Sequence, residues 1–235
     1  MTLTPIAVYQ VNSAAKDATS LVTPSFTPAV GEVIIVTAFA EDSAFTLGTV
    51  TGGTSTWASR YSNTTASNCS AYAWTTTIAT SAAMTVTTPA PTGPGGISWH
   101  SMTVSRWSGK LAATPAVGSA NNNTASSSTV TTVAANSAVV WGCADWNAVA
   151  PGTPTYRSSA TALGAPFAPA GAYTQYSAYQ QAPTAGAQTF GLSAPTGQQD
   201  NLFGIEVQAD TTTATATSIL LPHCSNTARD RAALR

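Results

Sequence analysis

Short runs of Thr, Val, Ile, Tyr, Trp and Phe recur along this chain, separated by Gly, Pro, Asn and Ser. Such runs are typical of β-strands between turns, whereas Leu, Glu, Lys and Arg, which build most helices, are scarce. The runs predict strands at residues 6–11, 20–26, 33–40, 69–77, 82–88, 97–107, 127–133, 136–144, 172–180, 186–192 and 202–209. So many short strands predict an all-β protein, an antiparallel β-sandwich with a barrel as the alternative.

Three of these runs also predict burial. Residues 33–40 are apolar on both faces, which predicts a central strand or one whose outer face contacts another subunit. In residues 202–209, apolar side chains alternate with Glu206 and Gln208, which predicts one face in solvent. Residues 97–107 place large side chains on both faces, so we expect a β-bulge there.

The chain resembles itself at an offset of about 104 residues. Residues 33–42 match 137–146, and the tetrapeptide Ala-Pro-Thr-Gly at 90–93 recurs at 194–197. This pattern predicts an internal pseudo-repeat with two structurally related halves.

The repeat suggests how the chain is divided. We expect one β-sandwich domain over residues 1–209, with pseudo-repeat halves at about 18–107 and 122–209. Two small tandem β domains are the alternative.

A different pattern begins at residue 210, which predicts an extended C-terminal tail over residues 210–235. Residues 211–217 form a Thr/Ala-rich connector, followed by an apolar patch and a basic end. We expect this tail to be an assembly segment held by a neighbouring subunit, although it could instead fold back onto its own sandwich. The expected contact residues are Ile219, Leu220, Leu221, Arg229, Arg231 and Arg235.

Charge is unusually rare, because only 7% of the residues are charged and the net charge is −1. The chain therefore lacks the basic field that nucleic acid binding needs and a polybasic segment for a membrane surface. Its longest apolar run has eight residues, too short to span a bilayer. The N-terminus has no basic region before an apolar run, so we expect no signal peptide. Neither nucleic acid nor membrane insertion is expected.

Cysteine spacing argues against a metal or disulfide framework. Cys69, Cys143 and Cys224 include no C-x-x-C pair. We expect buried free thiols, with a Cys69–Cys143 disulfide as the alternative.

The histidines predict no catalytic site. His100 and His223 are accompanied by no G-x-S-x-G motif, and His100 is interpreted as a hydrogen-bonded strand residue. We expect no catalytic residue, no metal ligand and no cofactor.

The carboxylates stand at strand ends. Glu41, Asp42 and Asp145 are interpreted as loop caps, with a Ca²⁺ site as the alternative, although no EF-hand-like loop is present. A glycosidase would need Glu206 to face a second carboxylate, and the candidate partners are Asp200 and Asp145.

Aromatic side chains on a sandwich surface can stack against sugar rings. Trp57, Trp146 and Tyr156 lie nearest to expected loops and are candidate glycan contacts. Packing within the fold is the alternative and favoured interpretation.

The order of these features resembles a β-sandwich module found in minor tail and other virion proteins of phages that infect Actinobacteria. The matching pieces are a Pro, Gly, acid and apolar strand sequence at residues 27–36, Tyr-Ala-Trp at 72–74, a strand ending in Ser-Gly at 104–109, and the closing strand at 203–207. The resemblance covers residues 5–209 and implies a jelly-roll-like sandwich.

The resemblance implies a structural or adhesive role. We expect a virion structural protein, a tail or fibre component active in assembly and host-surface attachment, made in the host cytoplasm. Its expected partners are other virion subunits in a homo-oligomer and a host-surface glycan. A capsid decoration protein and a non-catalytic carbohydrate-binding module are the alternatives.

Overall fold

The computed structural model describes residues 2–42, 44–64, 69–122, 126–146, 154–169, 173–196 and 199–210. Fifteen strands and one short 3-10 helix make up these parts, so the all-β prediction is confirmed. In chain order they are β1 (Pro5–Asn12), β2 (Leu21–Val22), β3 (Val33–Ala40), β4 (Ala58–Asn63), β5 (Ser70–Thr77), β6 (Thr87–Thr88), β7 (His100–Trp107), β8 (Val117–Asn122), β9 (Ser127–Thr132), β10 (Ser137–Asp145), β11 (Thr155–Tyr156), η1 (Arg157–Ser159), β12 (Thr161–Ala162), β13 (Thr174–Ala182), β14 (Gly186–Ala194) and β15 (Asp200–Val207).

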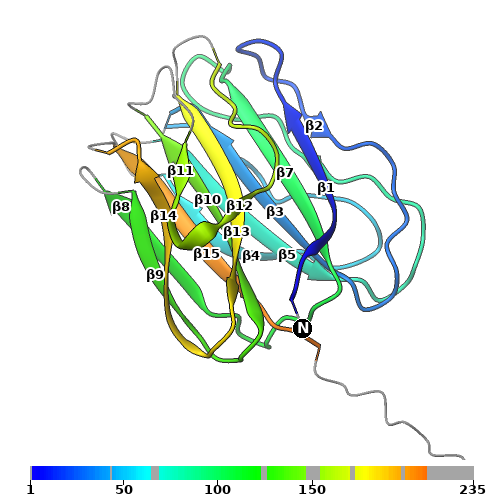
Figure 1. Cartoon of the computed structure of the whole chain (residues 1–235). Coiled ribbons are helices and arrows are strands. Elements are labelled where there is room, and N and C mark those ends of the chain that lie inside the picture. The colour runs from blue at the N-terminus through cyan, green and yellow to red at the C-terminus, as the bar shows by residue number, and fades with distance from the viewer. Residues whose placement is uncertain are drawn as a thin grey trace, which may run out of the picture.

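Two five-stranded antiparallel sheets form the centre of the molecule (Figure 1). The first inner sheet has the order β1-β7-β3-β5-β4, and the second inner sheet has the order β12-β13-β10-β15-β8. Two smaller sheets, β2-β6 and β11-β14-β9, complete the set. Each sheet takes its strands from one half of the chain, since β1 to β7 build two of the sheets and β8 to β15 build the other two.

The two inner sheets have corresponding strand orders. Numbered within its own half of the chain, each sheet places its first strand at an edge, next to its last strand, with the third strand in the middle. The smaller sheets correspond too, because β2 pairs with β6 as β9 pairs with β14. This topology is the one that an internal repeat requires; the sequence repeat and the jelly-roll likeness stay predictions.

The inner sheets pack face to face through large side chains. Phe39 of β3 stacks on Phe203 of β15 with ring centroids 5.9 Å apart, and Trp107 of β7 meets Tyr179 of β13 edge to face at 5.3 Å. Trp107, Phe39 and Phe203 are completely buried. Burial of aromatic and branched side chains on this scale is the main favourable contribution to such a fold.

The outer faces of both inner sheets are covered as well. On the first, Ile34 and Val36 of β3 pack in one cluster with Phe26 and Met84 from the segments that pair at the outer layer. On the second, Trp141 packs with side chains of β9 and β14. The prediction that residues 33–40 form a central strand is therefore confirmed, and both faces of β3 are buried.

The prediction that one face of residues 202–209 lies in solvent is wrong. Every residue of β15 is buried, because the three-stranded sheet covers the face that carries Glu206. The carboxylate of Glu206 is 1% exposed and accepts hydrogen bonds from the backbone N–H of Val133 and Ala134, at 3.1 Å each, and from Ser137 Oγ at 2.8 Å. Hydrogen bonding by three donors offsets the cost of burying this charge.

The bulge predicted within residues 97–107 is also misplaced. Strand β7 pairs with β3 in an unbroken register from His100 to Trp107. The register shift lies in the neighbouring strand instead, between Pro5 and Ala7 of β1.

A glycine makes room for the contact between the inner sheets. A Cβ atom built on Gly142 of β10 would lie 2.6 Å from Phe39 Cζ and 2.8 Å from Phe203 Cζ. We expect Gly142→Ala to lower the free energy of unfolding by about 1–3 kcal/mol, since overpacking a core displaces its rings. Urea denaturation checks this, with Thr131→Ala on an exposed position of β9 as the control. An unchanged midpoint for Gly142→Ala would show that the rings are not packed against this strand.

Candidate functional site

The side chains best able to do chemistry gather at one end of the stacked sheets, which we call the loop end. Here β1, β3 and β10 end and β7, β13 and β15 begin. A hydrogen bond of 3.2 Å between Ser101 Oγ and Tyr173 OH joins the two inner sheets at this end. Among the described residues, the titratable side chains of the loop end include Lys16, Asp17, Glu41, Asp42, Cys69, His100, Asp145, Tyr173 and Asp200.

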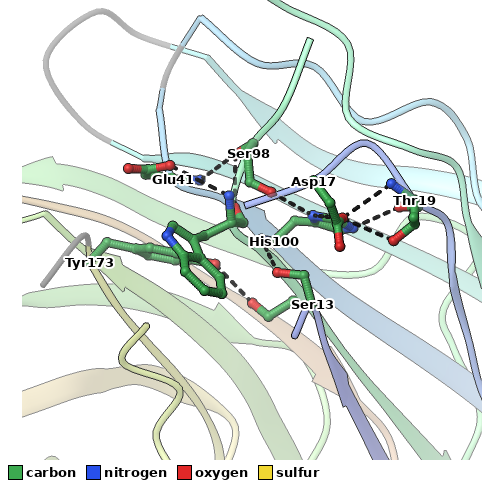
Figure 2. Close-up of polar contacts among 9 residues, drawn as sticks. Ser13, Asp17, Thr19, Glu41, Ser98, His100 and Tyr173 are labelled. Atoms are coloured by element: carbon green, nitrogen blue, oxygen red, sulfur yellow. Dashed lines mark hydrogen bonds and ion pairs between the residues drawn. The ribbon is translucent and has the colours of Figure 1, made fainter. Parts of the chain in front are cut away.

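His100 opens strand β7 and is completely buried (Figure 2). Its Nδ1 lies 3.0 Å from the Ser98 carbonyl oxygen, and its Nε2 lies 2.8 Å from the Thr19 carbonyl oxygen. Asp17 Oδ1 lies 3.9 Å from Nδ1. Because both ring nitrogens contact backbone oxygens, the imidazole ties the segment after β1 to the start of β7. His100 is the hydrogen-bonded strand residue that the sequence predicts.

Glu41 and Asp42 hold the chain that leaves β3. Glu41 forms an ion pair of 2.8 Å with Lys16 Nζ and accepts the Trp99 backbone N–H at 3.4 Å. Asp42 Oδ1 accepts the backbone N–H of Ala44 at 2.9 Å. These contacts agree with the interpretation of Glu41 and Asp42 as loop caps.

Asp145 lies at the last position of β10, and its interpretation as a loop cap stays a prediction. It ends β10 directly opposite Asp200 of β15, and both side chains are completely buried. The Trp146 N–H donates to the Gln199 carbonyl at 2.9 Å, so the adjoining 145–200 pair is the kind without mutual hydrogen bonds, in which side chains approach most closely. Two buried carboxylates thus lie on facing positions of neighbouring strands at the loop end.

Glu206 faces neither Asp200 nor Asp145. Glu206 lies opposite Val139, six residues along β15 from Asp200, which is about 20 Å at the rise of a β-strand. The facing pair Asp145 and Asp200 was missed, because it depends on β10 pairing with a strand more than fifty residues away. Within the described ranges, no group of three or more His, Cys, Asp or Glu side chains could hold a metal ion.

The cysteines of the described chain are free and buried, as predicted. Burial raises the pKa of the Cys69 thiol well above its ordinary value, and nearby Asp145 adds to the rise. Burial likewise raises the pKa of Cys143, with Asp200 and Asp145 adding to it. Both thiols are therefore held in the unreactive neutral form. Cys224 and His223 lie outside the described residues.

The three candidate glycan contacts lie in three different clusters. Trp57 packs on the outer face of the first inner sheet, and its Nε1 donates to the Gly52 carbonyl at 3.1 Å. Trp146 packs against the core between the inner sheets. Tyr156 meets the buried Trp141 edge to face at 5.6 Å. Each is half-buried, and the structure does not bring them together as one platform.

The six predicted contact residues of the tail, Ile219, Leu220, Leu221, Arg229, Arg231 and Arg235, lie outside the described residues. The described chain reaches Asp210, where Ala209 and Asp210 line a surface pocket together with Thr2, Leu3 and Ser108. The beginning of the tail thus lies beside the N-terminal segment, at the end of the molecule away from the loop end (Figure 1).

Three comparisons with known proteins give no family assignment. No family model, no curated protein and no solved structure matches the chain. In the part of the chain that the structure describes, no helix is long and apolar enough to cross a membrane.

We expect His100→Ala to lower the free energy of unfolding by about 1–3 kcal/mol, because the segment after β1 and the start of β7 lose the buried ring and its contacts with the Ser98 and Thr19 carbonyls. Amide exchange near Asp17 and Thr19 should rise with it, since the ring fixes this segment to β7. The control is Lys16→Ala, which removes an ion pair whose lysine is 46% exposed and should cost less than about 1 kcal/mol. Equal effects of the two variants would contradict the role given to the imidazole.

Buried tyrosines predict sensitivity to alkali. Burial raises the pKa of Tyr173 and of Tyr176, and Asp145 adds to the rise at Tyr176. The neutral phenol is favoured in the folded state, so its stabilisation is complete below the unfolded pKa of about 10 and is lost as the pH rises above it. We expect the unfolding free energy to fall above about pH 10, and Tyr176→Phe to make that fall less steep. Identical pH profiles for the variant and the parent would contradict this origin.

Proposed function

We propose that this protein is a structural component of a phage virion, part of the tail or fibre, and that it acts through packing and subunit contacts rather than catalysis. The observation that carries this proposal is the use of the loop-end side chains. Both nitrogens of His100, the carboxylate of Glu41 and that of Asp42 each hold a loop or a strand start in place. A catalytic group needs an accessible atom with which to reach substrate, and these groups are engaged in holding the fold.

The distribution of charge supports the same role. Arg106 donates two hydrogen bonds to the carboxylate of Glu32, from Nε to Oε2 at 2.9 Å and from Nη2 to Oε1 at 3.0 Å. Lys16 forms an ion pair with Glu41. These two ion pairs thus engage four of the few charged side chains within the sandwich, while several apolar side chains remain at the surface. Exposed ones occur in both halves of the chain: Ile6, Val8, Val22, Val30, Ile97, Val117 and Val133. Depletion of charged residues is typical of the buried centre of subunit interfaces, so a weakly charged surface suits contacts within an assembly.

Analysis of purified particles tests the proposal. We expect mass spectrometry of virions purified from a lysate that expresses this chain to find it in many copies per particle. Antibody labelling viewed by electron microscopy should place it on the tail or fibre. Labelling of the head instead would favour a capsid decoration protein. Presence in the lysate with absence from purified particles would overturn the structural role.

A further inference from the structure

Strand β1 is an edge strand whose outer side is open to another strand. It pairs with β7 on one side and stands at the end of the first inner sheet. Ser13 N–H donates to the His100 carbonyl at 2.9 Å, so by the alternation of antiparallel pairs Tyr9 and Val11 also bond to β7. The backbone groups of Val8, and of Gln10 two residues on, then point away from the sheet. A further strand would find donors and acceptors there.

The other edges of the inner sheets are protected, each in its own way. Strand β4 carries Arg60 and a register shift between Ser59 and Tyr61. Strand β12 has only two residues. Against β8 lies β9, so close that a Cβ atom on Gly118 would collide with the Thr129 carbonyl. Charge, a bulge, shortness and a cover are the usual means of preventing strand addition.

Strand β1 lacks these protections over most of its length. It has eight residues, none of them charged, and its irregularity is confined to the first two. Ile6 is 49% exposed and Val8 is 36% exposed. Tyr9 and Val11 pack toward the outer cluster, so Val8 faces the opposite side, where Gln10 bonds to Ala165 in the loop after β12. An uncharged, partly apolar and regular edge of this kind can accept a further strand by β-augmentation.

The chain itself carries a segment of matching chemistry that starts nearby. The last described residue, Asp210, lies in one pocket with Thr2 and Leu3, just before β1 begins. Residues 211–221 follow with no charge, no Pro and a sequence of Thr, Ala, Ser, Ile and Leu that favours extended structure. Eight residues of strand span about 26 Å, which eleven residues easily provide.

The distribution of charge indicates in which direction this segment would run along β1. A segment that starts beside Leu3 and follows β1 reaches the loop end, where Asp17, Glu41 and Asp42 lie with Lys16 as the basic group among the described residues. The sequence beyond it carries three arginines, at 229, 231 and 235. Opposite charges thus meet when the segment runs parallel to β1.

We propose that residues 211–221 dock on the open edge of β1 as a sixth strand of the first inner sheet. The occupant is this segment whether it belongs to the same copy or to a neighbouring one, and a neighbouring donor would link subunits. The docking does not depend on the virion role, which concerns where the protein works.

Amide exchange in the full chain tests the docking. We expect the N–H groups of Val8 and Gln10 to exchange about tenfold or more slowly than unpaired amides, because a docked strand accepts their hydrogen bonds. The double variant Ala214→Pro, Ala216→Pro removes two donors from the segment and should abolish this protection. Protection of Tyr9 and Val11, which bond to β7, should remain.

A matched control carries Ala228→Pro and Ala232→Pro, two further alanines of the same tail outside the docking segment, and should keep the protection of Val8 and Gln10. Fast exchange of Val8 and Gln10 in the parent chain would overturn the proposal. Protection that survives in the Ala214→Pro, Ala216→Pro variant would overturn it too, since that result indicates another occupant, such as β1 of a second copy.

A second variant acts on the receiving strand. Val8→Pro removes an outward N–H and spares the bonds to β7, as proline does on a free edge. We expect it to release the segment, detected as faster exchange of residues 211–221, whereas Val8→Ala should not. Unchanged exchange in Val8→Pro would contradict docking on β1. Failure of these tests would leave the virion proposal standing, and absence from particles would leave the docking standing.

Discussion

The contact between the two inner sheets is the interaction on which the rest of the molecule depends. Each inner sheet has a second cover on its far side, so its central strands have no face in water. Strands of that kind cannot alternate apolar and charged residues. The low charge of the chain follows directly, because these strands offer few positions at which a charge could be hydrated.

Burial on this scale also decides where polar groups can stand. Those inside need partners, since an unpaired buried polar group costs free energy. Asn201 shows how the need is met between sheets, because it donates to the Cys69 carbonyl at 2.9 Å and accepts from Tyr61 OH at 2.6 Å. Thr37 and Ser177 do the same with two hydroxyl groups 3.0 Å apart. Neutral hydroxyl and amide groups perform the work that ion pairs do in more charged proteins.

The sequence predicted best what depends on local pattern. The runs at residues 33–40 and 136–144 became β3 and β10, because apolar runs with β-branched and aromatic residues favour buried strands. Strands β4 and β8 were missed, since edge strands bury less and their sequences, with Arg60 and Gly118, lack apolar runs. Two-residue strands such as β11 and β12 carry no period at all.

What was misjudged depends on pairing between distant segments. Alternation in residues 202–209 indicated a wet face, but an outer sheet made of β9, β11 and β14 covers it. The pairing of Asp145 with Asp200 arises from the same long-range order. Local pattern thus identified most strands, while the neighbours of each strand decided which side chains came together.

Each half of the chain supplies its own inner and outer sheet, so the two inner sheets that face each other are made one after the other during synthesis. During synthesis the first half is finished while the face bearing Phe39 and Trp107 still has nothing to cover it. An exposed apolar face of this kind can bind other newly made chains. The covalent connection holds the second half at high local concentration and so shortens the exposure of this face. The presence of both halves in one polypeptide thus limits the time in which one nascent chain can capture another.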